Sequence, residues 1–157
     1  MRRVVVTGIG TINSTGHNVK DSFEAVVNGV CGIDTITLFD ASDFSVKIAG
    51  EVKDFDPTTV MDKKEVKKAD RFIQLGIKAA HEAMIDSGYV TADNKKVDGS
   101  IADRFGIISG SGIGGLSTIE RNSVVCETKG SRKVSPFFIP SSLANMLSGF
   151  ISIEHNL

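Results

Sequence analysis

The sequence predicts an α/β protein in which helices cover a parallel sheet, and three observations lead to this prediction. Residues 4–8 and 104–110 are short apolar runs that end at glycine, as strands buried on both faces do. The remaining chain contains longer segments whose apolar side chains recur at helical spacing. Strands that alternate with such helices are typical of layered α/β folds. Because an average sheet has about five or six strands, two strands predict that this chain is part of a larger domain.

The N-terminal half contains two predicted helices. Residues 19–30 form the first, and its apolar face carries Phe23, Val26, Val27 and Val30. Residues 31–57 are irregular, although 46–52 could form a short edge strand. Residues 62–88 form a long helix that begins with a capping box between Asp62 and Glu65 and ends at Gly88. Its apolar stripe consists of Val66, Ala69, Phe72, Ile73, Ile77, Ala80 and Met84.

The C-terminal half is predicted as loop, strand, helix, loop and helix. Residues 90–104 are polar and form a surface loop before the second strand. A helix over 115–128 follows. Pro136 and Pro140 restrict the residues before them, which predicts a loop over 129–140. Residues 141–157 form an apolar helix.

Composition limits the classes of function. The chain has 157 residues, 41% of them hydrophobic, and a formal net charge of -1, which suits one domain and argues against a nucleic-acid binder. No run approaches the roughly 18 apolar residues that cross a membrane. Cys31 and Cys126 form no close pair and show no metal-ligand spacing, which favours a reduced, cytoplasmic setting.

Residues 110–115 (GSGIGG) match the pattern G-x-G-x-x-G of dinucleotide-binding turns. That function also needs a second strand that ends in an acidic residue about 20 residues on. Here the corresponding segment is basic and broken by proline. The glycines are therefore predicted to permit close backbone approach, with Ile113 as a lone apolar side chain that could line a narrow channel. A nucleotide-binding oxidoreductase is the last-ranked alternative.

Four motifs, in order along the chain, resemble the N-terminal part of the type II β-ketoacyl-[acyl-carrier-protein] synthases. They are RRVVVTGIG, DKKEVKKADRFIQLGIKAA, FGIISGSGIGGLSTIE and RKVSPFFIPSSLANM. The resemblance implies a partial thiolase-like domain over residues 1–157, layered α-β-α-β-α in the complete fold. One departure is GTINSTGHNV, where the family usually has a serine-proline-x-glycine turn.

The resemblance implies a 3-oxoacyl synthase of fatty-acid elongation, which performs a decarboxylative Claisen condensation without a cofactor or a metal. In the family a cysteine accepts the acyl chain, and two histidines and a lysine complete the site. All four are expected beyond Leu157, so no catalytic residue is assigned within this segment, and the segment alone is expected to be inactive. Cys31 and Cys126 are interpreted as buried or incidental thiols, and His17, His81 and His155 as structural or surface residues.

The resemblance also implies binding residues and partners. Ile113, Phe138 and Leu143 are expected to line the acyl pocket, with Phe138 reaching across a homodimer interface. The expected partners are acyl carrier protein and acyl and malonyl thioesters, with no nucleic acid and no membrane. A non-catalytic subunit resembling a chain-length factor is the main alternative. Carrier docking is expected at Lys64, Lys67, Lys68, Arg132 and Lys133.

Overall fold

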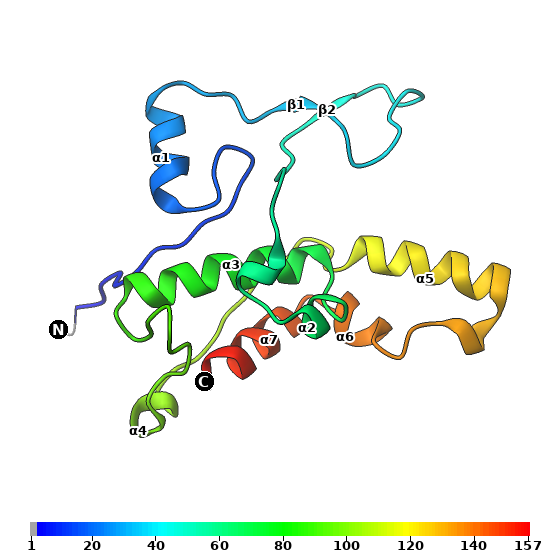
Figure 1. Cartoon of the computed structure of the whole chain (residues 1–157). Coiled ribbons are helices and arrows are strands. Elements are labelled where there is room, and N and C mark those ends of the chain that lie inside the picture. Colours follow the sequence, from blue (N-terminus) through cyan, green and yellow to red (C-terminus); the bar gives the residue numbers. More distant parts are fainter. Residues whose placement is uncertain (1–2) are drawn as a thin grey trace.

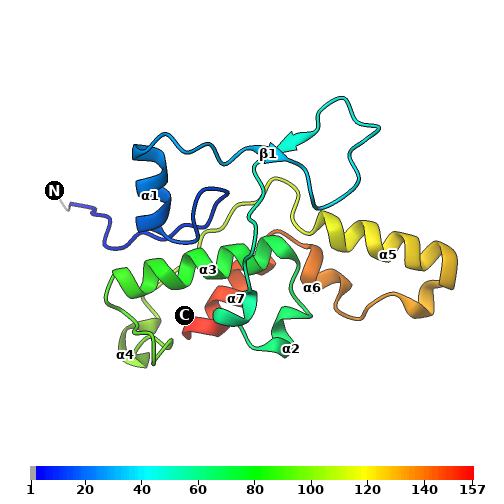
Figure 2. The ribbon, with the colours of Figure 1, turned by 45° about the horizontal axis from the view of Figure 1, so that its top comes forward.

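Helix α3 (Arg71–Asp86) is the element around which the described chain, residues 3–157, is arranged in this computed structural model (Figure 1). It packs against α7 (Met146–His155), and two views place these helices side by side (Figures 1 and 2). Ile73 and Ile77 of α3 are fully buried in the core that the two helices share. Gly76 permits this contact, because a Cβ there would lie 2.5 Å from a methyl carbon of Leu147. The long amphipathic segment thus forms the core that its periodicity predicts.

Smaller elements complete this helical layer. The 3₁₀ turn η1 (Pro57–Thr59) leads into the core residues Val60 and Met61. Helix α4 (Gly99–Ala102) lies in the segment predicted as a loop, and it covers a second small core. Within residues 3–157, no helix combines the length and the apolar character needed to cross a bilayer.

The first predicted strand is wrong for the described part of the chain. Val4, Val5 and Val6 are 96, 70 and 80% exposed and belong to no ladder. A strand exists only through hydrogen bonds to a neighbour, and residues 3–157 offer this segment no partner strand. It continues instead along α3, where a Cβ on Gly8 would lie 2.3 Å from the Ala83 carbonyl oxygen. Arg2, which begins the first motif, lies outside the described residues.

The second predicted strand is also wrong, for the same reason. Residues 105–110 run as an extended connection between α4 and α5 and pair with no strand of the described chain (Figure 1). Ile107 packs on the main core, whereas Ile108 is fully exposed. The hydroxyl oxygens of Ser109 and Ser148 lie 2.6 Å apart, so the segment is held by α7 rather than by a sheet.

The described ladder is antiparallel rather than parallel, and it is short. Strand β1 (Asp34–Thr35) pairs with β2 (Ile48–Ala49). Strand β2 lies within the edge strand expected over 46–52 but contains only two residues. Helix α1 (Val19–Val27) is confirmed, and Asn18 caps it by accepting from the Asp21 N–H. Both elements lie on the side of α3 opposite α4 (Figures 1 and 2). The apolar face of α1, with Phe23, Val26 and Val27, is exposed, because no described element covers it. Val30, expected on the same face, follows the end of the helix and is exposed too.

The predicted helix over 62–88 is divided in two. Helix α2 (Lys63–Val66) is a single turn, and the chain bends before Asp70 caps α3. Asp62 makes no side-chain capping bond, so the predicted capping box is absent. The Gln74 amide holds the bend by donating to the Ala69 carbonyl oxygen at 2.9 Å.

The C-terminal elements agree only in part with expectation. Helix α5 (Leu116–Lys129) is confirmed. The predicted loop after it contains the 3₁₀ turn η2 (Ser131–Lys133) and the start of α6 (Phe138–Ser142). The predicted apolar helix over 141–157 is interrupted between α6 and α7, where Leu143 has an extended backbone.

Candidate functional site

The glycine turn before α5 is packed directly onto the end of α6. Gly114 has a φ of +79°, a conformation that glycine adopts at no steric cost. The Gly115 N–H donates to the Ser142 carbonyl oxygen at 2.9 Å, and a Cβ on Gly115 would lie 2.4 Å from the Ser141 carbonyl oxygen. By contrast, a Cβ on Gly110 or Gly112 would meet nothing within 4 Å. Gly114 and Gly115 therefore serve the close backbone approach that was predicted for the glycines of this motif, whereas Gly110 and Gly112 do not.

The three predicted acyl-pocket residues lie around this junction. Ile113 precedes the packed glycines and is 66% exposed. A Cβ on Gly114 would lie 2.5 Å from the Ser142 carbonyl oxygen and 3.2 Å from the Ala144 nitrogen, so the turn meets both neighbours of Leu143. Phe138 begins α6 and is half-buried. Ile113 and Leu143 therefore flank the junction, and in this chain both are exposed, at 66 and 45%, instead of enclosing a slot.

The lysines predicted for docking surround α2 rather than beginning the long helix. Lys64 lies within this single turn, Lys67 is its C-cap, and Lys68 follows. These lysines therefore lie outside α3, which begins only at Arg71. Lys68 Nζ lies 2.6 Å from the Glu65 carboxylate and 5.4 Å from the centre of the Phe137 ring, whereas Lys64 and Lys67 are exposed.

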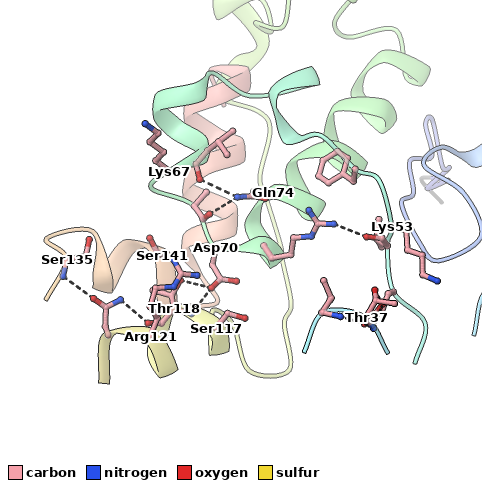
Figure 3. A pocket seen from close by; sticks show the side chains of 18 of the residues that line it. Thr37, Lys53, Lys67, Asp70, Gln74, Ser117, Thr118, Arg121, Ser135 and Ser141 are labelled. Carbon is pink, nitrogen blue, oxygen red and sulfur yellow. Dashed lines mark hydrogen bonds between the residues drawn. The ribbon is translucent and has the colours of Figure 1, made fainter. Parts of the chain in front are cut away.

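The second basic pair, Arg132 and Lys133, lies on η2 at the far end of α5 and is exposed. A hollow of about 1080 Å³ connects it to the first group, because both Lys67 and Lys133 line it. Figure 3 shows Lys67 on one side of this hollow and Arg121 of α5 on another. The fold thus brings together basic residues that lie 66 positions apart in the sequence.

The hollow contains three further cationic side chains that sequence reasoning missed, namely Lys53, Arg71 and Arg121. Five cationic and three acidic residues line it, so its formal charge is about +2 by that count. Arg71 is held in place: its guanidinium donates to the Val52 carbonyl oxygen at 2.9 Å and lies 5.2 Å from the centre of the Phe55 ring. The positions lie on different elements, so no local pattern could have identified them.

One acidic residue near the hollow is strongly held. Glu51 accepts from the Thr37 hydroxyl at 2.7 Å and from two backbone N–H groups, of Thr37 and Leu38. The hydrogen bond from the Thr37 hydroxyl is the main cause that lowers the pKa of Glu51. The carboxylate is therefore charged at neutral pH and ties the segment after β1 to the segment after β2.

The two cysteines lie at the surface of the described chain. Cys31 and Cys126 are both exposed, which excludes the buried interpretation and leaves the incidental one. His81 of α3 and His155 of α7 stack in the core with ring centroids 5.7 Å apart. Burial, and then the nearby Lys95, lower the pKa of His81. These two histidines have the structural role expected of them, and His17 lies edge-on to Phe55.

The sequence itself belongs to a known family. A family model described as the beta-ketoacyl synthase N-terminal domain matches residues 1–157, so the chain belongs to this family. Two similar curated proteins are both named 3-oxoacyl-[acyl-carrier-protein] synthase 2. The protein from Vibrio harveyi is 48% identical over 157 residues, and that from Coxiella burnetii 44% over 156. The alignments cover 99% of this chain and 36% of each relative, so the chain spans about a third of their length.

Solved structures confirm the predicted fold class. The ishigamide ketosynthase/chain length factor is similar with a TM-score of 0.77 at 27% identity, over 98% of this chain and 37% of that one. A type II polyketide ketosynthase, solved in complex with its acyl-carrier protein, is similar with a TM-score of 0.74 at 25% identity, over 98% and 38%. The path of the chain is that of a ketosynthase N-terminal portion, although its extended segments are unpaired here.

Proposed function

We propose that this chain is the N-terminal part of a 3-oxoacyl-[acyl-carrier-protein] synthase, an acyltransferase of fatty-acid elongation. The observation that carries this proposal is the family match over the entire chain, together with 44–48% identity to two proteins named as such synthases. Their names favour an enzyme over a non-catalytic subunit, and the nucleotide-binding alternative has no support among them.

The proposed reaction joins an acyl thioester to malonyl-acyl carrier protein. The acyl group passes from its carrier to a cysteine thiolate, and the carrier thiol leaves. Malonyl-carrier protein loses carbon dioxide, and the resulting enolate carbon attacks the acyl carbonyl carbon. A carbon–carbon bond forms while the cysteine thiolate is released, and hydrogen-bond donors stabilise the oxyanion in between. The cysteine, two histidines and a lysine that perform these steps belong, in this proposal, to the polypeptide beyond residue 157.

The chain itself would contribute the wall of the acyl pocket and the face that receives the carrier protein. The convergence of Lys67 and Lys133 on one basic hollow supports a face for an acidic partner, since charge complementarity steers association. A similar ketosynthase was solved with its acyl-carrier protein bound. In the proposed cytoplasmic homodimer, the half-buried Phe138 would complete the pocket of the second copy.

A condensation assay tests this proposal. Full-length protein is supplied with acyl- and malonyl-carrier protein, and 3-oxoacyl-carrier protein and carbon dioxide are measured together. We expect both products from the full-length protein and neither from residues 1–157 alone. Turnover by the 157-residue chain would contradict the assignment of the nucleophile. A full-length protein that is inactive alone, yet changes the chain length made by a second subunit, would instead establish the chain-length-factor alternative.

A further inference from the structure

One buried carboxylate, that of Asp70, caps two helices at once. Asp70 is the N-cap of α3, where its Oδ1 accepts from the Phe72 N–H at 3.4 Å. Its Oδ2 accepts from the Thr118 N–H at 3.0 Å and from the Thr118 hydroxyl at 2.6 Å (Figure 3). Thr118 is the third residue of α5, and the N-cap of that helix, Gly115, has no side chain to supply the bond. Asp70, which belongs to the start of α3, therefore provides for α5 the hydrogen-bond acceptor that the N-cap of a helix usually provides.

This carboxylate joins the two halves of the candidate site. On one side of Asp70 lies α2 with its lysines, and on the other lies the glycine turn that carries Ile113. Two contacts beside it tie α6 into the same joint: the Ser141 hydroxyl donates to the Lys68 carbonyl oxygen, and Gly115 donates to Ser142. Both Asp70 and Thr118 are 8% exposed. A buried carboxylate that accepts several hydrogen bonds holds the donor groups in fixed positions, because any displacement leaves a charge without partners.

We propose that Asp70 is a positioning residue for carrier-protein recognition. It holds α5 against the bend between α2 and α3, so that Lys67 and Lys133 line one hollow and present a single basic face. Without the joint, the two basic groups would move independently and an acidic partner could engage only one of them well. This inference rests on the proposed function, and it adds to it a residue that is only 8% exposed at the hollow and acts through the helices that it joins.

The variant Asp70→Asn tests the joint in the full-length protein. An amide has one acceptor oxygen, so asparagine can cap one helix but not both. We expect the KM for acyl-carrier protein to rise at least about fivefold, the lower end of measured couplings between linked sites. The KM and kcat for a small acyl-pantetheine thioester, which needs no docking face, should change much less than the KM for the carrier, because the bond from Gly115 to Ser142 still holds the turn that carries Ile113. An equal loss with both substrates would show a general structural defect and overturn the proposal.

Asp62→Asn is the matched control. Asp62 is an N-cap beside the same lysines, is exposed, and makes no side-chain capping bond. Removal of a negative charge from a basic face should leave the KM for an acidic carrier unchanged or lower it. If Asp70 acted only through its charge, both variants should leave the KM for the carrier unchanged or lower it. If Asp70 positions the basic face, the KM should rise only in Asp70→Asn. A rise of equal size in both variants would overturn the proposal.

Thr118 supplies a second test that preserves the buried charge. Thr118→Val removes the hydroxyl donor and keeps the backbone donor, so its KM for the carrier should lie between those of wild type and Asp70→Asn. Thr118→Ser retains the hydroxyl and should restore the wild-type value. A Thr118→Val variant equal to wild type would contradict the joint even if Asp70→Asn fails to fold.

Hydrogen exchange separates failure of this inference from failure of the proposed function. If the wild-type protein performs no condensation, the proposed function is wrong, and the joint is then judged by exchange alone. Asp70→Asn should accelerate exchange of the Thr118 amide and its neighbours at the start of α5, while Asp62→Asn should not. If condensation occurs but the carrier KM and the exchange of α5 are unchanged in Asp70→Asn, only the present inference is overturned.

Discussion

Replacement of the glycines one at a time would show which chemistry the G-x-G-x-x-G turn serves. In a dinucleotide-binding turn the first two glycines form the tight turn and let the backbone approach the pyrophosphate. In this structure Gly110 and Gly112 have open space around them, whereas Gly115 touches the backbone of α6. Gly115→Ala should therefore destabilise the protein, and Gly110→Ala and Gly112→Ala should not.

The magnitude follows from the contact at Gly115. An added Cβ would lie 2.4 Å from the Ser141 carbonyl oxygen and 2.9 Å from the Ser142 Cα, both backbone atoms that cannot rotate away. Overpacking of this kind costs about 1–3 kcal/mol. Displacement of the turn also weakens the bond from Gly115 to Ser142, worth about 0.5–1.5 kcal/mol. Alanine also restricts the unfolded chain more than glycine does, and this offsets about 0.4–1 kcal/mol of the loss in stability. The net expected loss is about 2 kcal/mol, which corresponds to roughly 4–8 °C in Tm for a chain of this size.

Urea and thermal unfolding of the three variants measure this difference. Gly110→Ala and Gly112→Ala should stay within about 0.5 kcal/mol of wild type or be slightly more stable, since neither position has a positive φ. Addition of NAD(P) should leave every Tm unchanged. If Gly112→Ala is as destabilising as Gly115→Ala, or if NAD(P) stabilises the wild type and not Gly112→Ala, the packing interpretation is refuted.

Three further predictions concern the pocket, the docking face and the core. In the full-length enzyme, Ile113→Phe should lower kcat/KM for long acyl chains by about tenfold, as about 1.4 kcal/mol of obstruction implies; equal elongation of long and short chains would place Ile113 outside the channel. Lys64→Glu with Lys68→Glu should raise the KM for the carrier several-fold at low salt and much less at high salt, and kinetics that do not change at low salt would remove these lysines from docking. Because burial and Lys95 depress the pKa of His81 in the folded state, its contribution to stability should be complete above about pH 6.5 and decline as the pH falls below it. His81→Leu should flatten the fall of Tm between pH 7 and pH 5, and a profile parallel to wild type would exclude His81 as its cause.

Several elements could be predicted because short-range patterns decide them. The apolar stripe around Ile73 and Ile77 identifies a helix and its buried face without any knowledge of its neighbour. Helix α5 was likewise predicted from local sequence. The bend before α3 was not, because Asp70 favours it through bonds to Thr118, which lies 48 residues further along the chain. Arg71 and Arg121 were missed as lining residues of the hollow for the same reason.

The sequence by itself determined the family, the helices whose apolar faces are periodic, and the positions of the glycine turn and of the two basic groups. These properties depend on residue type and on spacing within a few turns. Only the tertiary structure decided whether an apolar run becomes a strand, which glycines make backbone contact, and which cationic residues share a hollow. A ladder, a close approach and a joint electrostatic face each need a partner from a distant part of the chain. Residues 4–7, exposed and unpaired here despite a strong β pattern, show that a local preference does not supply that partner.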